Sequence, residues 1–190
     1  METSRAEACK MNLQGIALDF KTWAMSRRNQ EVPRASGVQF FITPWRDRKV
    51  EISPEQAQRY QCPNVPVNQI NPYLDPNDPE SWWADFDVID GSYSSYAGRD
   101  MEEHFRVNPA KKPYEPMVAD DNNSDMEGMF IQNHGNGVTN VLMMSGAVRQ
   151  YDNAILLERG TAMELDEDGV AWLRIGPGSP VPELEKLSLD

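Results

Sequence analysis

One apolar stripe near the N-terminus constrains the fold more than any other feature of this chain. Apolar residues recur there at steps of four, three, four and three positions, namely at Cys9, Leu13, Ile16, Phe20 and Trp23. This spacing places them on one side of an α-helix. No proline interrupts the segment before Pro33. We therefore predict an amphipathic helix from Ser4 to about Asn29, which must bury its stripe against another element.

Short apolar segments separated by turn residues follow this helix. GVQFFITPW, residues 37–45, is rich in β-branched and aromatic residues and predicts a strand. Residues 46–90 are rich in proline, asparagine and aspartate, which disfavours helix and predicts an extended loop. Trp82 and Trp83 would anchor that loop, since packing explains such a pair more simply than ligand binding does. GSYSSYAGRD, residues 91–100, predicts a strand near a sheet edge.

The C-terminal half predicts two β-hairpins. Residues 141–144 and 147–151 flank the turn Ser145–Gly146, and residues 162–165 and 170–175 flank a loop that contains glycine.

One long helix followed by several short strands indicates an α+β fold. We expect the helix to pack on an antiparallel sheet with long Pro/Asn-rich loops. A chain of 190 residues suits one domain, which we place at residues 1–175. Residues 176–190 begin with prolines and predict a tail that is loose or lies along the surface.

Charge and hydropathy exclude several classes of function. The formal net charge is −12, and no basic stripe is present to bind nucleic acid. The chain contains no run of about 18 apolar residues that would predict a membrane-spanning helix. The first ten residues, METSRAEACK, lack the apolar core of a secretory signal.

Cys9 and Cys62 are the only cysteines. Two cysteines without C-x-x-C spacing are too few to make a zinc site by themselves. The residues leave two states open: two buried thiols, or one disulfide, which would indicate an oxidising compartment.

His134 opens a Gly/Asn-rich turn and is the first candidate for chemistry. The chain has no G-x-S-x-G elbow, so a Ser-His-Asp system is not indicated. A histidine and carboxylate site with Asp120 or Asp121 is the alternative, and it would suit a metal-dependent hydrolase. A histidine that is hydrogen-bonded within a turn is the simpler interpretation. No group of nucleophile, base and oxyanion donors emerges, so we predict a non-enzymatic module.

An acidic segment close to His134 is a candidate calcium site. Oxygen-bearing side chains alternate in it as they do in a calcium-binding loop. The EF-hand pattern then fails, because Met126 stands where glycine is required and Gln132 stands where the closing glutamate is required. A loop-built calcium site is thus the alternative to a solvated turn. Its ligands would be Asp120, Asp121, Asn123 and Asp125.

The order of these motifs resembles that of type IV pilin-like proteins. Residues 4–24 resemble the segment after the transmembrane part, with its Cys-x-x-Asn-Leu-x-x-Ile pattern. RYQCPN, residues 59–64, resembles a Phe-x-Cys-Pro step, and residues 92–100 resemble a Ser-Tyr strand. Residues 133–152 resemble the C-terminal signature of the prepilin-type processing-associated (H-x-DG) domain of planctomycete-like bacteria. That signature combines a histidine, a Gly/Asn turn, an Asn-Val-Leu strand and Asp-Gly.

This chain departs from the signature in two places. Ser145–Gly146 replaces Asp-Gly, so any role of that aspartate is absent. The gap between His134 and Ser145 is one residue longer than the nominal spacing. The resemblance covers about residues 4–30 and 60–152, and it leaves the last part of the chain unexplained.

The resemblance implies a structural subunit, a pilin or pseudopilin, of a type II secretion or type IV pilus-type filament. Its partners would be other such subunits and the assembly machinery. Family members carry a cleaved leader and an apolar half-helix, so we expect a removed N-terminal segment to anchor the protein in the inner membrane. The globular domain would then be periplasmic or extracellular. A filament-tip binding module or adhesin, using the Trp82 and Trp83 loop, is the alternative.

The resemblance also bears on individual residues. An exported location favours a Cys9–Cys62 disulfide. The calcium ion of major pseudopilins favours the calcium site. His134, Asn140 and Gly146 would fix the geometry of the hairpin.

Overall fold

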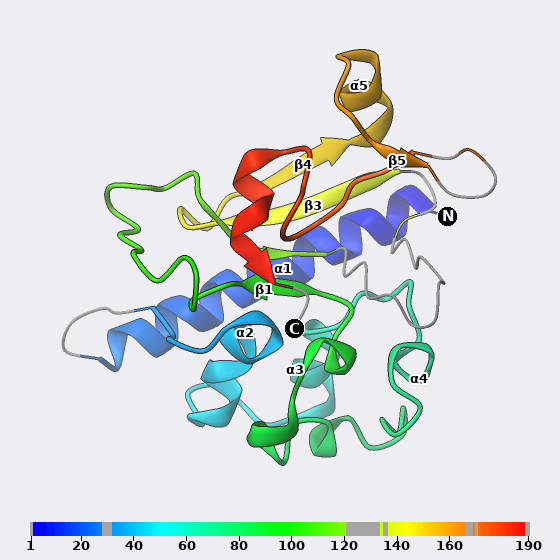
Figure 1. Cartoon of the computed structure of the whole chain (residues 1–190). Coiled ribbons are helices and arrows are strands. Elements are labelled where there is room, and N and C mark those ends of the chain that lie inside the picture. The colour runs from blue at the N-terminus through cyan, green and yellow to red at the C-terminus, as the bar shows by residue number, and fades with distance from the viewer. Residues whose placement is uncertain are drawn as a thin grey trace.

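A five-stranded antiparallel sheet with the order β4-β3-β2-β1-β7 organises the computed structural model, which describes residues 2–27, 32–120, 134, 137–165, 169 and 171–188. The sheet is drawn in Figure 1. Its strands are β1 (Ala97–Arg99), β2 (Pro116–Ala119), β3 (Val138–Met143), β4 (Val148–Asp152) and β7 (Leu187–Ser188).

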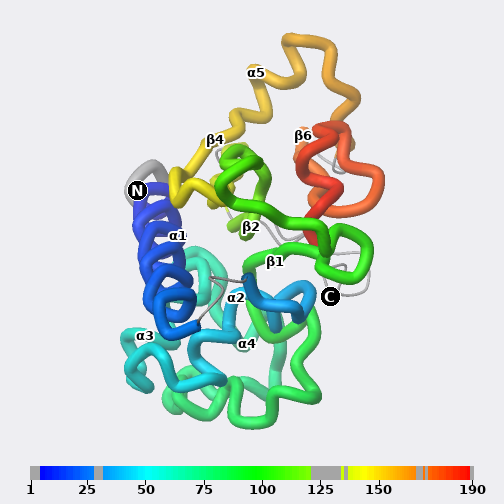
Figure 2. The backbone as a smooth tube through the Cα atoms, turned by 90° about the vertical axis from the view of Figure 1, so that its left-hand side faces the viewer, coloured from blue at the N-terminus to red at the C-terminus, as the bar shows by residue number. Residues whose placement is uncertain are grey.

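Helix α1 (Glu2–Met25) lies across one face of this sheet (Figures 1 and 2). The predicted stripe faces inward: Cys9, Leu13 and Ile16 are inaccessible to solvent, and Phe20 and Trp23 are buried. The predicted α+β class, with a long N-terminal helix on an antiparallel sheet, is confirmed at this coarse level. The last predicted residues of the helix, 28 and 29, lie outside the described residues.

The sheet separates two hydrophobic cores because successive residues of a strand face opposite sides. Val118 and Leu142 face the core that contains α1. Their neighbours Ala119 and Val141 face a second core, which residues 173–187 complete. Figure 2 shows α1 on one side of the strands and the C-terminal segment on the other.

Residues 37–46, predicted as a strand up to residue 45, form helix α2 (Gly37–Arg46), so that prediction was wrong. β-Branched and aromatic content favoured a strand, but Val38, Phe41, Ile42 and Trp45 also follow the i, i+3, i+4, i+7 spacing of a helix. The helix is buried over most of its length between α1 and β1, so packing overrides local propensity.

The Pro-rich region, residues 46–90, is less extended than predicted. It contains two short helices, α3 (Pro54–Arg59) and α4 (Val67–Ile70), and two 3-10 helices, η1 (Pro79–Ser81) and η2 (Phe86–Val88). A further 3-10 helix, η3 (Gly91–Tyr93), follows directly after this region. Pro54 and Pro79 occupy the start of their helices, where the missing N–H has no cost. Prolines here begin helical turns as well as interrupting them.

Trp82 and Trp83 are both buried, as predicted for packing anchors. The Trp83 ring meets the rings of Trp45 and Tyr60 edge to face, with centroids 5.4 Å apart in each pair. It contacts Trp82 in the same way at 5.8 Å. The Pro-rich region therefore covers one end of the hydrophobic core that contains α1.

Both predicted hairpins are confirmed. β3 and β4 pair in register from Val138 opposite Asp152 to Leu142 opposite Val148. The second hairpin is short, with β5 (Glu164–Leu165) paired to β6 (Ala171–Trp172). Of residues 91–100 only β1 is a strand, and it lies inside the sheet, with the short β7 beyond it.

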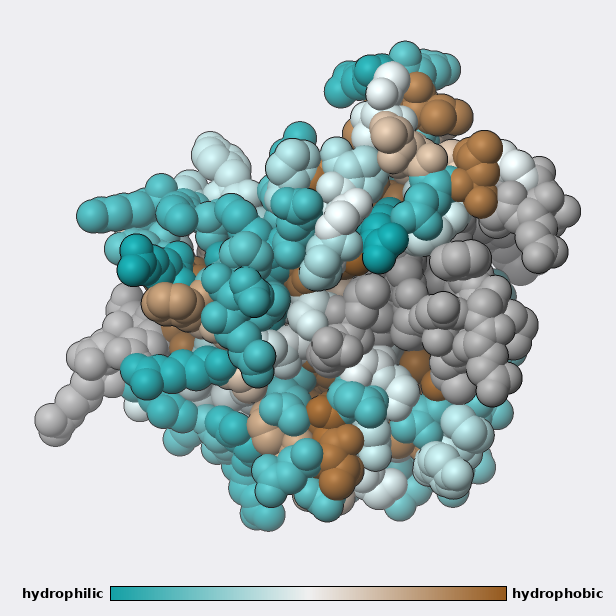
Figure 3. All heavy atoms as spheres, viewed as in Figure 1, coloured by the Kyte–Doolittle hydropathy of each residue, from teal (hydrophilic) through white to brown (hydrophobic). Residues whose placement is uncertain are grey.

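Helix α5 (Asn153–Glu158), which was not predicted, connects the two hairpins. It projects at the top of the molecule in Figure 1. Figure 3 shows a mainly hydrophilic face, with apolar side chains gathered near α5 and β5. The exposed apolar residues of these elements are Ile155, Leu157 and Leu165.

The predicted tail is part of the fold. After the 3-10 helix η4 (Pro182–Lys186), strand β7 pairs with β1, and Leu184 and Leu187 are fully buried. The segment therefore covers the second core.

Candidate functional site

A buried polar site lies between α1 and the sheet, around Asp120. This residue directly follows β2, and its N–H donates to the Asn140 carbonyl oxygen on β3 (2.9 Å). Strand alternation directs the Asp120 and Asn140 side chains to the α1 face, beside Val118 and Leu142. Both polar side chains are inaccessible to solvent.

From the residues that the structure describes, the Asp120 carboxylate accepts three hydrogen bonds there. Oδ1 accepts from the Asn140 backbone N–H (2.7 Å). Oδ2 accepts from Asn140 Nδ2 (2.6 Å) and from His134 Nε2 (2.8 Å). Asn140 Nδ2 also donates to the Ala6 carbonyl oxygen of α1 (3.2 Å). The carboxylate thus connects the end of β2 with Asn140 of β3, with His134 four residues before β3 and, through Asn140, with the helix.

The hydrogen bonds of His134 define its tautomer. Its Nδ1 lies 2.9 Å from Asn64 Nδ2, which can only donate, so Nδ1 is the acceptor. Nε2 then carries the proton that is donated to Asp120. A carboxylate that holds one ring nitrogen in this way fixes both the tautomer and the orientation of the ring.

Cys9 of α1 and Cys62, just after α3, lie next to this histidine. Both thiols are free and buried. Their sulfur atoms and one ring nitrogen of His134 all lie within 4.8 Å of one another. Cys62 is held by its N–H, which donates to Ser95 Oγ (2.6 Å). We refer to Cys9, Cys62 and His134 together as the CCH cluster.

Burial, reinforced by the neighbouring Cys62, raises the pKa of the Cys9 thiol far above its usual range. A hydrogen bond with Tyr96 opposes this increase only weakly. The cysteine is therefore a protonated thiol at neutral pH and a poor nucleophile.

The residues predicted for calcium are not shown together. Asp120 directs its carboxylate into the core, where protein donors occupy both oxygens. Asp121, Asn123 and Asp125 lie outside the described residues.

The three residues of the predicted hairpin signature are placed differently from one another. His134 and Asn140 meet at Asp120, whereas Gly146 lies at the far end of the hairpin. Gly146 has a φ of +85°, and a side chain there would face the Ala17 Cβ of α1. Its N–H donates to the Met143 carbonyl oxygen and closes the β3–β4 turn.

The CCH cluster lies apart from two cavities among the described residues. A cavity of about 720 Å³ lies between the C-terminal half of α1 and residues 101–110, with Phe20, Trp23 and Phe105 in its wall. A second, of about 280 Å³, is lined by charged residues that include Arg99 and Glu115. The CCH cluster contributes to neither wall.

Sequence reasoning missed the grouping of Cys9 and Cys62 with His134. The three residues are far apart along the chain, and no spacing motif connects them. The signal that could have found them is topological. When a helix packs across a sheet, a cysteine on its buried side contacts residues that lie just before or just after the central strands.

Comparison of the chain with protein-family models, with curated proteins and with solved structures gave no match. Within the described residues, no helix combines the length and the apolar character needed to cross a bilayer.

Proposed function

We propose that this protein is a structural subunit of a pilus-type or type II secretion-type filament and that it acts by assembling with other subunits. The observation that carries the proposal is a second apolar stripe on α1, opposite the buried one. Met11, Leu18 and Met25 are 69%, 61% and 82% exposed, and they are spaced by seven residues.

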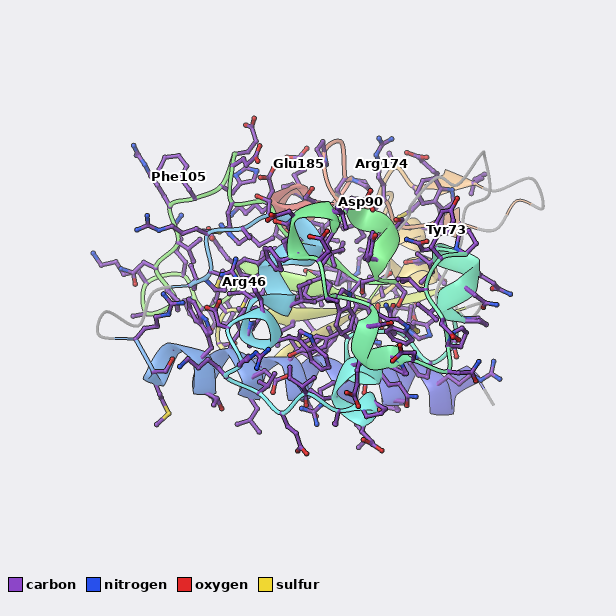
Figure 4. The ribbon with its side chains drawn as sticks, turned by 90° about the horizontal axis from the view of Figure 1, so that it is seen from below. Arg46, Tyr73, Asp90, Phe105, Arg174 and Glu185 are labelled. Atoms are coloured by element: carbon purple, nitrogen blue, oxygen red, sulfur yellow. The ribbon has the colours of Figure 1, made fainter. Side chains whose placement is uncertain are left out.

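A spacing of seven residues keeps side chains on one side of a helix, which is the arrangement by which helices pack on one another. α1 forms one margin of the molecule in Figure 4, so a partner can approach this outer stripe. Repeated exposure of large apolar side chains on one helix face indicates a contact surface. The inner stripe binds the sheet, and the outer stripe would bind a neighbouring subunit.

The resemblance to pilin-like proteins supports the same proposal, since helix-to-helix packing builds their filaments. The membrane anchor, the periplasmic or extracellular position of the globular domain and the pilin or pseudopilin partners belong to this proposal too. They rest on the resemblance alone.

Two observations weigh against the alternatives. A tip adhesin that used Trp82 and Trp83 would need them on the surface, and both are buried. A hydrolase built on His134 and Asp120 would need an open site, and both side chains are buried, at 2% and 0% exposure. A role in assembly requires neither an exposed tryptophan loop nor a catalytic cavity.

Site-specific photocross-linking in the native cell envelope tests the proposal. A photoreactive residue at Met11 or Leu18 should give cross-links to other filament subunits or to further copies of the chain. The same residue at Tyr73, which is 92% exposed and lies after α4 (Figure 4), is the matched control. Equal, purely monomeric products at all three positions would contradict the proposal.

A further inference from the structure

The CCH cluster brings three metal-binding side chains together in the core from three separate parts of the chain. Its sulfur and nitrogen atoms lie within 4.8 Å of one another, and exposure of the residues ranges from 0% to 2%. We propose that Cys9, Cys62 and His134 bind one zinc ion, which joins α1 to the sheet and to the segment after α3. This site is independent of the proposed function.

The donor atoms suit zinc in kind and in spacing. Cysteine thiolates and a histidine nitrogen are its usual ligands in structural sites. Tetrahedral zinc, with Zn–S distances of about 2.3 Å and Zn–N distances of about 2.0 Å, holds its ligand atoms roughly 3.5–3.8 Å apart. The separations in the cluster are at most 4.8 Å, so zinc binding would have to draw the three ligand atoms together by up to about 1 Å. The fourth position would be taken by water or by an oxygen from a neighbouring side chain.

The surroundings of His134 match those of a metal-binding histidine. Ligating histidines commonly donate their second ring N–H to a carboxylate, which sets the tautomer and increases the basicity of the ligand. Here Nε2 donates to Asp120 (2.8 Å), and Asn140 holds Asp120 in place through two hydrogen bonds. Nδ1 remains for the metal, which would replace the hydrogen bond from Asn64.

Charge balance favours a divalent ion. Zinc binding releases the protons of both thiols, and two thiolates then neutralise the two positive charges of the ion. The ion and its three ligands together carry no net charge, which avoids the large desolvation cost of an unpaired buried charge.

Zinc binding and a Cys9–Cys62 disulfide exclude each other. The disulfide forms when both thiols lose their protons and two electrons to an oxidant, and neither sulfur is then a thiolate. One sample therefore distinguishes the two states through its metal content, its thiol count and its mass.

The experiment uses the full chain, purified without oxygen in the presence of zinc and freed of excess metal. Elemental analysis should find about one zinc per chain. Cobalt substitution should give thiolate-to-cobalt charge-transfer bands and the visible bands of a tetrahedral ion. Chelation should lower the thermal midpoint, and adding zinc back should restore it. Because these measurements use the unmodified chain, they do not depend on the folding of any variant.

Variants then assign the ligands. Cys62→Ser and His134→Gln should lose the cobalt charge-transfer spectrum or change it, whereas His104→Gln, at the other histidine, should leave it intact. Asp120→Asn should weaken zinc binding by about 10–100-fold. The proposal is overturned if the unmodified chain holds less than roughly a tenth of an equivalent of zinc with both thiols reduced. A disulfide-bonded chain whose reduced form also fails to bind zinc or cobalt would overturn it equally.

Discussion

Asn140 Nδ2 lies 2.6 Å from Asp120 Oδ2, so a single buried amide supports the carboxylate that holds His134. The same nitrogen donates to the Ala6 carbonyl oxygen of α1. Helix and sheet are therefore connected by polar contacts as well as by apolar ones. Because these groups are buried, each depends on its partners for the hydrogen bonds that water would otherwise provide.

Asn140→Asp tests this relationship with an almost isosteric change. It replaces the donor to Asp120 with an acceptor and places two carboxyl groups in contact within the core. We expect a loss of about 2–4 kcal/mol in the free energy of unfolding at neutral pH, measured by urea denaturation. Asn68→Asp, at an exposed amide of α4, is the control and should change it by less than about 0.5 kcal/mol. Equal effects of the two substitutions would show that Asp120 does not depend on this amide.

The ionisation of Glu115 should make the free energy of unfolding decrease in acid. Burial by itself raises the pKa of this carboxyl, but Lys186, Lys112 and Arg99 outweigh it and lower the pKa to about 2, from an ordinary 4.5. Lys186 Nζ and Arg99 Nη2 each lie 2.8 Å from a Glu115 carboxylate oxygen. The ionised form is therefore favoured by folding. Its contribution is fully present above pH 4.5 and is lost as the pH falls from 4.5 to about 2.

The shift corresponds to roughly 3 kcal/mol of stability at neutral pH, as an order of magnitude. Glu115→Gln should therefore lower stability at pH 7 and flatten its decrease between about pH 5 and pH 2, as followed by urea denaturation at each pH. Glu102→Gln, at an exposed carboxylate, should leave the profile unchanged. A profile for Glu115→Gln that runs parallel to that of the unmodified chain would contradict the assigned network.

A substitution at Gly98 of β1 tests how α2 packs on this strand. Helix α2 is the element that differs most from the sequence prediction. A Cβ at Gly98 would overlap the backbone carbonyl oxygen of Gly37, which cannot move without displacing the start of α2. We expect Gly98→Ala to cost more than about 3 kcal/mol or to prevent folding, as judged by circular dichroism and urea denaturation. Gly160→Ala has open space but a φ of +79°, and it should cost only about 1 kcal/mol. If Gly98→Ala were as stable as Gly160→Ala, the close contact between the start of α2 and Gly98 would be contradicted.

The tryptophans give a test of the core that needs no substitution. All five, Trp23, Trp45, Trp82, Trp83 and Trp172, are at most 5% exposed. The tryptophan fluorescence of the folded chain should be blue-shifted and only weakly quenched by acrylamide. Unfolding in urea should shift the emission to the red and increase the quenching. Trp83→Ala should cost about 3–5 kcal/mol, against less than about 0.5 kcal/mol for Tyr73→Ala. Strong quenching in the native state would contradict the buried aromatic cluster and revive the exposed tryptophan loop.

The sequence predicts those elements whose pattern allows only one structure. The α1 stripe fits a helix alone, and the turn at Ser145–Gly146 fits a hairpin. Residues 37–45 fit two structures, because their apolar content favours a strand and their spacing a helix. Only the surrounding core decides between them. The leucines at 184 and 187 join a core whose other half is distant in sequence, so local pattern could not reveal it.

The candidate site was predicted in parts. His134, Asn140, Cys9, Cys62 and Asp120 were all singled out, and His134 with Asp120 was named as an alternative histidine and carboxylate site. The cysteines were assigned only to a disulfide or to free thiols, and Asp120 also to a calcium site. These residues come together because α1 packs across β2 and β3. This packing is a tertiary contact that no local sequence pattern shows. Asn64, which binds the second nitrogen of His134, had no signal of its own.

The most direct test of the central proposal is the fraction of protein recovered in filaments sheared from cells that carry Leu18→Lys. This change places a charge on the outer stripe of α1 and, at an exposed position, should alter the stability of the subunit by less than about 0.5 kcal/mol. We predict that the filament fraction decreases at least about tenfold, as expected if at least roughly 1.4 kcal/mol of packing is lost at each contact, while Tyr73→Lys assembles normally. Normal assembly of Leu18→Lys, or no incorporation of the unmodified chain into any filament, would contradict the account.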